Sequence, residues 1–145
     1  MIRKDNLEAM IKAIGYIQSS RTKVYEKKYT QFDCVIEVDF NGSGSINYPE
    51  DKGMKITRKT TCNFSQPENF VVLECITRLM DKGYRPEHIE LEKEWTLGHS
   101  DKGGFADILV KDAEGKTLFI VECKTAGNEY KKELNNQTLF QHFTG

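Results

Sequence analysis

Two apolar runs near the end of the chain decide its fold: GFADILV at residues 104–110 and TLFIVECK at residues 117–124. The polar residues DAEG lie between them, and this composition is typical of a turn. Two β-prone runs joined by a short turn predict an antiparallel hairpin. A turn centred between Glu114 and Gly115 places Asp107 directly opposite Glu122.

This pairing gathers charge at one end of an otherwise apolar hairpin. Cross-strand partners project to the same face, and Lys124 follows Glu122 by two residues, so both share a face with Asp107. The remaining positions, residues 108–110 and 119–121, are apolar on both faces. We therefore expect a sheet that is buried on both sides, with charged groups gathered at one end.

Two carboxylates that face each other destabilise a hairpin unless something offsets their repulsion. A divalent cation does so, and carboxylate oxygens together with the Cys123 carbonyl are hard ligands that suit Mg²⁺. Lys124 would then hold or polarise an attacking water and help to neutralise a bound phosphate. The pattern outlines a site for phosphodiester hydrolysis. A plainer interpretation stays open, with Asp107 as an exposed strand-end residue and Glu122 with Lys124 as a solvated pair.

Signals on either side of the hairpin extend the fold. Residues 70–81 have an apolar helical pattern that begins at a capping box over residues 65–68 and stops at Gly83. Residues 89–97 follow as a strand, and residues 129–143 have the pattern of a second helix. The order is therefore helix, three strands in a meander, helix.

The first part of the chain predicts an N-terminal addition to this core. The apolar spacing over residues 6–17 predicts a helix capped by Asp5. Residues 32–40 and 46–48, separated by the turn residues NGSG, predict a hairpin. Residues 54–61 predict a weak strand or an extended linker.

Together these elements predict an α/β fold with a mixed α+β sheet, organised as a single domain over residues 1–145. Residues 1–61 form the added helix and hairpin, and residues 62–145 form the core. The sequence stops where its last predicted helix should end, so we expect a fragment of a longer protein.

Asp107 followed by Glu122-Cys123-Lys124 resembles the PD-(D/E)xK nuclease signature. The surrounding residues are most similar to the N-terminal nuclease domain of type I restriction-enzyme R subunits, a module that also occurs fused to DNA methyltransferases. The resemblance covers residues 65–145 and implies a restriction-endonuclease-like core. It further implies that Asp107 and Glu122 bind Mg²⁺, with Mn²⁺ as an alternative, and that Lys124 assists the nucleophilic water.

The family also places an acidic residue on the helix before the signature and a Gln on the helix after it. Glu74 matches the first position, although it lies away from the apolar face of its helix and is equally well explained as a solvated residue. Gln137 is preferred for the second position, with Gln141 as the alternative. No Tyr follows at the family's usual place.

The resemblance implies a Mg²⁺-dependent DNA endonuclease that is the cleavage domain of a restriction–modification system. Its partners would be DNA and other domains or subunits of that system. Two alternatives stay open: a cleavage-inactive domain of the same fold that binds DNA or docks other subunits, and an unrelated interaction domain. The presence of Asp107, Glu122 and Lys124 together favours an active site over an inactive one.

Composition places further limits on function. The 145 residues carry 21 Lys and Arg against 22 Asp and Glu, a formal net charge of -1. Affinity for DNA rests mainly on phosphate neutralisation, so we expect weak binding by this domain alone. No apolar run approaches the ~18 residues that span a bilayer, and the N-terminus lacks a signal-peptide pattern. The four cysteines form no CxxC pair, so we expect a cytoplasmic protein with reduced thiols and no membrane contact.

Overall fold

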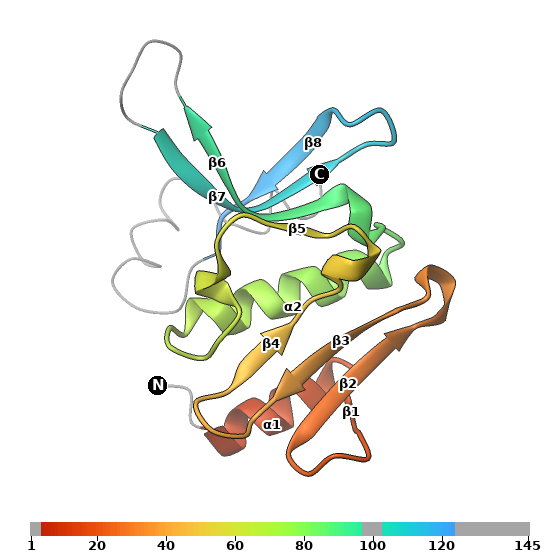
Figure 1. The fold of residues 1–145 in the computed structure, drawn as a ribbon, viewed down its shortest axis with the longest axis vertical. Helices are drawn as coiled ribbons and strands as arrows, with labels where there is room; N and C mark the ends of the chain where they lie inside the picture. Colours follow the sequence, from red (N-terminus) through yellow and green to blue (C-terminus); the bar gives the residue numbers. More distant parts are fainter. Residues whose placement is uncertain (1–3, 97–102, 124–145) are drawn as a thin grey trace.

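The computed structural model describes residues 4–96 and 103–123 (Figure 1). These residues form two α-helices and two four-stranded sheets, which confirms the predicted α+β class. In chain order the helices and strands are α1 (Lys4–Ala13), β1 (Ile17–Gln18), β2 (Val24–Tyr29), β3 (Cys34–Asp39), β4 (Ser45–Asn47), β5 (Lys55–Ile56), α2 (Glu68–Asp81), β6 (Ile89–Thr96), β7 (Gly103–Lys111) and β8 (Thr117–Val121).

The first sheet contains β1, β2, β3 and β4 in that order, and every neighbouring pair is antiparallel. The predicted hairpin corresponds to β3 and β4, which pair with Val38 opposite Ile46. The sequence pattern does not predict β1 or β2. The β2 sequence, VYEKKY, lacks a clean apolar alternation, so its place depends on pairing with a strand on each side.

The prediction of a helix over residues 6–17 is wrong at both ends. α1 begins at Lys4, so Asp5 lies within the helix and does not cap it. α1 ends at Ala13, because Gly15 adopts a φ of 101° that favours glycine and turns the chain. Ile17 then belongs to β1 and is 63% exposed, so it is not part of an apolar helix face.

The second helix, α2, lies where its apolar pattern predicts, but it begins without the predicted capping box. Pro67 occupies the N-cap position, and no side chain caps the helix. The Ser65 hydroxyl donates to Asn63 Oδ1 at 2.6 Å instead. The predicted stop is confirmed, because Gly83 adopts a φ of 105° and its N–H donates to the Met80 carbonyl at 3.1 Å.

The second sheet has the order β5-β6-β7-β8, and β6, β7 and β8 form the predicted antiparallel meander. Ile108 pairs with Val121 and Leu109 with Ile120, which is the predicted hairpin register. β5 pairs parallel to β6 at the other edge of this sheet. Residues before position 61 therefore contribute a strand to the second sheet as well as forming the first.

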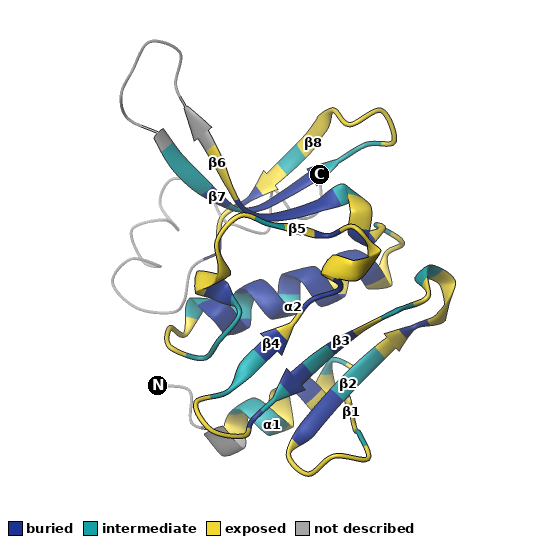
Figure 2. Cartoon of the chain, in the orientation of Figure 1, coloured by how far each residue is buried: buried dark blue, intermediate teal, exposed yellow. Residues whose placement is uncertain are grey.

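The prediction of two buried faces is confirmed for β7, where Ile108, Leu109 and Val110 are all buried, but it is wrong for β8. In β8, Leu118 is 52% exposed and Ile120 38% exposed, whereas Val121 is fully buried (Figure 2). The apolar run predicts two covered faces because it cannot show which elements pack against a strand. Of the helices described, α2 covers one face, and the opposite face at β8 carries exposed apolar side chains.

One continuous hydrophobic core joins α2 to both sheets, and α2 lies between the two sheets (Figure 1). Two buried tyrosines connect the first sheet region to the helix. The Tyr16 hydroxyl lies 2.9 Å from Thr77 Oγ1, and the Tyr29 hydroxyl donates to the Thr77 carbonyl at 3.1 Å. Because these bonds satisfy polar atoms inside the core, they set how the first sheet docks on α2.

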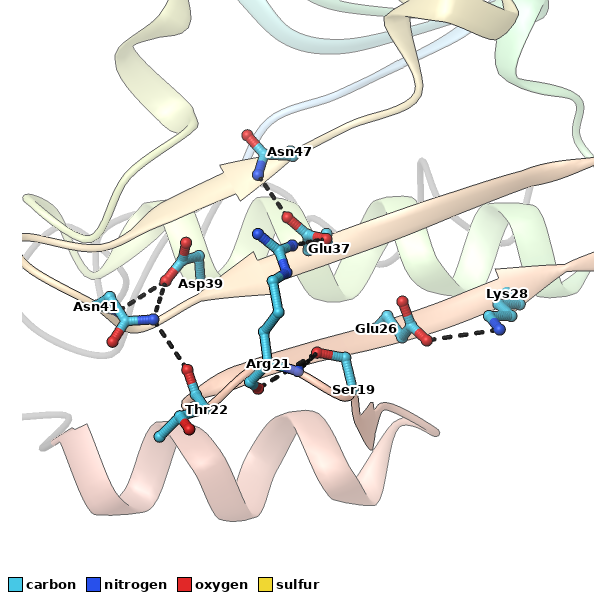
Figure 3. Close-up of polar contacts among 9 residues, drawn as sticks. All are labelled: Ser19, Arg21, Thr22, Glu26, Lys28, Glu37, Asp39, Asn41 and Asn47. Atoms are coloured by element: carbon cyan, nitrogen blue, oxygen red, sulfur yellow. Dashed lines mark hydrogen bonds and ion pairs between the residues drawn. The ribbon is translucent and has the colours of Figure 1, made fainter.

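The outer face of the first sheet is polar, and its charged side chains pair with one another (Figure 3). Arg21 pairs with Glu37, whose carboxylate also accepts a hydrogen bond from Asn47 Nδ2 at 3.1 Å. Asn41 Nδ2 donates to Asp39 Oδ1 at 2.9 Å. This face resembles an ordinary solvated surface. No helix in residues 4–96 or 103–123 is long and apolar enough to cross a membrane.

Candidate metal and phosphate site

A hollow of about 290 Å³ opens where the start of α2 meets the middle of β6 and β7 and the residues directly after β8. Its lining is mainly polar and combines carboxylates, hydroxyls and amides. The lining residues are Thr60, Thr61, Gln66, Glu68, Asn69, Val72, Glu92, Asp107, Glu122 and Cys123. The predicted residues Asp107, Glu122 and Cys123 are thus brought to one place.

Strand pairing is what brings Asp107 and Glu122 together. Ile108 pairs with Val121, so the next position along the hairpin sets Asp107 against Glu122. The Asp107 side chain is half-buried, and its Oδ2 accepts a hydrogen bond from the Cys123 N–H at 2.7 Å. Glu122 is exposed at the mouth of the hollow. The Asp107 carboxylate is therefore held by the backbone N–H of Cys123, whereas the Glu122 side chain is exposed to solvent.

Glu92 is a third carboxylate at the hollow, beside Asp107, and the sequence analysis did not predict it. Leu91 pairs with Ile108 and Lys93 with Ala106, which places Glu92 across from Asp107 on the opposite strand from Glu122. Glu92 is buried and has a φ of 54°, a conformation that costs a non-glycine residue of order 1 kcal/mol. The alternation of Glu90, Glu92 and Glu94 in β6 is the signal that points to this position.

The carboxylate of Glu92 is held by residues that precede the predicted core. Arg58 Nη2 lies 2.8 Å from Glu92 Oε2, and Thr60 Oγ1 donates to Glu92 Oε1 at 3.3 Å. The Arg58 guanidinium also stacks on the Phe105 ring, 3.4 Å from its centroid. The N–H of Thr57 donates to the Leu91 carbonyl at 3.0 Å. The segment after β5 therefore forms one wall of the hollow.

The structure does not bring Glu74 to the hollow. Its carboxylate accepts a hydrogen bond from Arg78 Nη2 at 3.0 Å, one turn further along α2. Glu68, in the first turn of α2, lines the hollow in its place. Glu68 and Glu74 are six positions apart, which corresponds to a rise of about 9 Å along the helix. The first turn of α2 lies at the hollow, and Glu74 is therefore too far along the helix to reach it. The two remaining predicted residues, Lys124 and Gln137, lie outside the described residues, as does Gln141.

Cys123 has a buried side chain directly behind the carboxylates. Its Sγ lies 4.0 Å from the Sγ of Cys75, which belongs to α2. The hydrogen bond between the two sulfurs, burial, and the nearby charges of Asp107 and Glu122 all raise the pKa of the Cys123 thiol. The four cysteines are free thiols, as predicted.

The donor set of the hollow suits Mg²⁺ bound partly through water. In residues 4–96 and 103–123, no three His, Cys, Asp or Glu side chains are grouped to enclose an ion by themselves. Mg²⁺ in proteins usually takes one or two carboxylates and keeps several waters, so Asp107 with Glu122 meets that need. The wall also carries the Thr61 hydroxyl, which is buried without a hydrogen-bond partner among the described residues. These oxygen donors fit a hard cation better than a soft one.

No family model matches this chain, and no curated protein matches it closely enough to count as a relative.

Proposed function

We propose that this chain is a Mg²⁺-dependent endodeoxyribonuclease domain of a restriction–modification system. The observation that carries the proposal is that Asp107 of β7 and Glu122, directly after β8, both line a polar hollow. Carboxylates that lie side by side are stabilised by a bound cation, and a cation that also binds a DNA phosphate supplies the chemistry of cleavage.

In this proposal, Asp107, Glu122 and the Cys123 carbonyl hold the ion. Bound Mg²⁺ would polarise a phosphodiester and lower the pKa of an attacking water. The Cys123 N–H fixes one Asp107 oxygen and so orients this carboxylate at the hollow. Lys124, by its place two residues after Glu122, would orient the attacking water and offset negative charge on the phosphate.

The polar wall opposite the strands supplies hydrogen-bond donors for a phosphate backbone. Asn69 is buried and its amide is already engaged, because Nδ2 donates to the carbonyls of Thr60 and Asn63 at 3.0 Å. That clamp holds the Thr60–Thr61 segment against α2. Gln66, which is exposed on the rim, is the side chain placed to donate to the DNA backbone.

The net charge and the free thiols support the proposed partners and the proposed cellular compartment. A domain of net charge -1 gains little from counterion release, so in this proposal other domains or subunits deliver it to DNA. Four free thiols suit the reducing cytoplasm, where a restriction system works.

The proposal is tested by isosteric replacement of the two carboxylates. We expect Asp107→Asn and Glu122→Gln each to lower Mg²⁺-dependent cleavage of plasmid DNA by at least about 100-fold, because each removes one charged ligand worth several kcal/mol. Nicking and linearisation are followed on gels, with Mn²⁺ as a second ion. Glu74→Gln, on the same helix as Glu68 but away from the hollow, is the matched control and should cut normally.

Two results would count against a nuclease. Unchanged cleavage in both carboxylate variants would show that any nuclease activity resides elsewhere. Absence of cleavage and of Mn²⁺ binding by the unsubstituted protein, with DNA binding retained in a gel-shift assay, would favour the cleavage-inactive domain.

A further inference from the structure

Two buried thiols lie next to each other behind the hollow. Cys75 is on α2 and Cys123 follows β8, so they are far apart in sequence, yet their Sγ atoms are 4.0 Å apart. Cys75 is 4% exposed and Cys123 3% exposed. By contrast, Cys34 and Cys62 are only partly buried. The contact between Cys75 and Cys123 therefore depends on the tertiary structure and not on closeness in sequence.

The contact is close to what a disulfide needs. A disulfide has sulfurs about 2.05 Å apart, so these two must approach by roughly 2 Å to form one. Cys123 lies beyond Val121, the last residue of β8, and its N–H donates to a side chain rather than to a sheet partner. Its backbone is therefore not tied into the sheet ladder, whereas Cys75 is held rigidly in the middle of α2.

The hollow gives a small oxidant a path to this pair. Cys123 contributes to the lining of the hollow, whereas Cys75 lies behind it and does not. A molecule the size of hydrogen peroxide fits easily into a hollow of about 290 Å³. The hollow therefore gives the oxidant access to the pair from the Cys123 side, and the two sulfurs are close enough for the second to resolve the first that reacts.

We propose that Cys75 and Cys123 form a reversible disulfide, a redox-modification site beside the candidate metal site. One sulfur of the pair, as its thiolate, attacks one oxygen of a peroxide, the O–O bond breaks, and a sulfenic acid and one water are formed. The other sulfur then attacks the sulfenic sulfur, and a second water leaves as the S–S bond forms. Overall, the two thiols lose two protons and two electrons, and the peroxide is reduced to two waters.

The disulfide would change the candidate site through one hydrogen bond. The Cys123 N–H holds Asp107 Oδ2 at 2.7 Å, and drawing the Cys123 side chain toward α2 displaces that N–H. On the basis of the proposed nuclease function, the oxidised protein cuts DNA more slowly than the reduced protein, and dithiothreitol restores the rate. The disulfide itself does not depend on that function.

Mass spectrometry of the 145-residue chain tests the disulfide directly. Tryptic peptide 60–78 contains both Cys62 and Cys75, so the Cys62→Ser variant is used to make the assignment unambiguous. After hydrogen peroxide treatment we expect the intact mass to fall by about 2 Da. We also expect peptide 60–78 to be linked to peptide 117–124, and dithiothreitol to reverse both changes.

Two matched variants sharpen the result. Cys75→Ser removes one thiol of the pair, so the cross-link to peptide 117–124 should be lost. Cys34→Ser leaves the pair intact and should behave like the unsubstituted protein.

The disulfide proposal is overturned if Cys75 and Cys123 both stay fully alkylatable after peroxide treatment, or if Cys123 proceeds to sulfinic acid without a cross-link. Because these measurements require no activity, such a failure leaves the nuclease proposal untouched. Absence of cleavage by the fully reduced protein would count against the nuclease proposal alone.

Discussion

Asp107 of β7 lies between two carboxylates, Glu92 of β6 on one side and Glu122, directly after β8, on the other. The sequence predicts the pairing with Glu122 from a turn centred between Glu114 and Gly115. The turn is in fact centred on Glu114, because Lys111 pairs with Thr117, and a register shift between Val110 and Lys111 restores the predicted pairs further along the hairpin. The pairing with Glu92 is not predictable in the same way. The segment between β6 and β7 gives no equally sharp turn, so the register of those strands is known only from the folded structure.

A second buried carboxylate, Glu90, shows how this sheet tolerates charge. Lys111 Nζ lies 2.7 Å from Glu90 Oε1, and Lys93 Nζ lies 3.6 Å from Oε2. Burial alone would raise the pKa of Glu90, but the hydrogen bond and charge of Lys111, with Lys93 and Lys55, lower it below its ordinary value. The ion pair therefore stabilises the folded state.

We predict that Lys111→Met lowers the free energy of unfolding by about 2 kcal/mol at pH 7, because it leaves a buried carboxylate with weaker compensation. The lowered pKa means that the contribution of the pair is present above the unfolded pKa of ~4.3 and is lost as pH falls through the folded value. Urea unfolding from pH 7 to pH 3.5 measures both effects. A deficit that stays constant or grows on acidification would contradict this account.

At the scale of elements, α2 shows which helix signals are reliable. Its apolar spacing and its glycine stop are local properties, and the structure confirms both. Its capping box is wrong, because Ser65 is used in a turn with Asn63 that leads the chain into Pro67. The position of Glu74 in the apolar pattern of α2 likewise does not predict which turn of the helix lies against the sheet. Glu68 reaches the hollow because the helix points its first turn there.

We predict that Gly83→Ala destabilises the protein by about 1 kcal/mol, since an L-residue is strained at a φ of 105°. A Cβ at this position would meet no atom within 4 Å, so the cost is one of backbone conformation and not of packing. Gly83→Asn is the matched variant and should lose less, because Asn tolerates left-handed backbone better. Urea unfolding followed by circular dichroism measures the difference. Equal stability of all three proteins would refute this assignment.

At the scale of the whole molecule, the N-terminal residues are more than an addition. They supply β5 to the second sheet, the Arg58 and Thr60 side chains to the Glu92 carboxylate, and much of the common core. Ile36, Val38 and Phe40 of the first sheet region are essentially inaccessible to solvent. Removal of the first sheet would therefore expose the face of α2 that it covers.

We predict that a chain of residues 62–145 does not unfold cooperatively, whereas the 145-residue chain does. The shorter chain loses the strand that pairs with β6 and the tyrosines that bond to Thr77, so its remaining core is too open to support one folded state. Circular dichroism during urea titration distinguishes the two. A sharp transition in the shorter chain would show that the core predicted from the sequence is self-sufficient.

The sequence by itself determined the local features of this protein: α2 and its glycine stop, the β3–β4 hairpin, and the β7–β8 register that pairs Asp107 with Glu122. These features depend on residues close together in the chain, where spacing and turn chemistry act directly. Only the tertiary structure decided that Glu92 and Glu68 join the hollow, that the segment after β5 forms its wall, and that Cys75 meets Cys123. Those contacts depend on how helix and sheets dock, and docking is set by the shape of a shared core that no local pattern encodes.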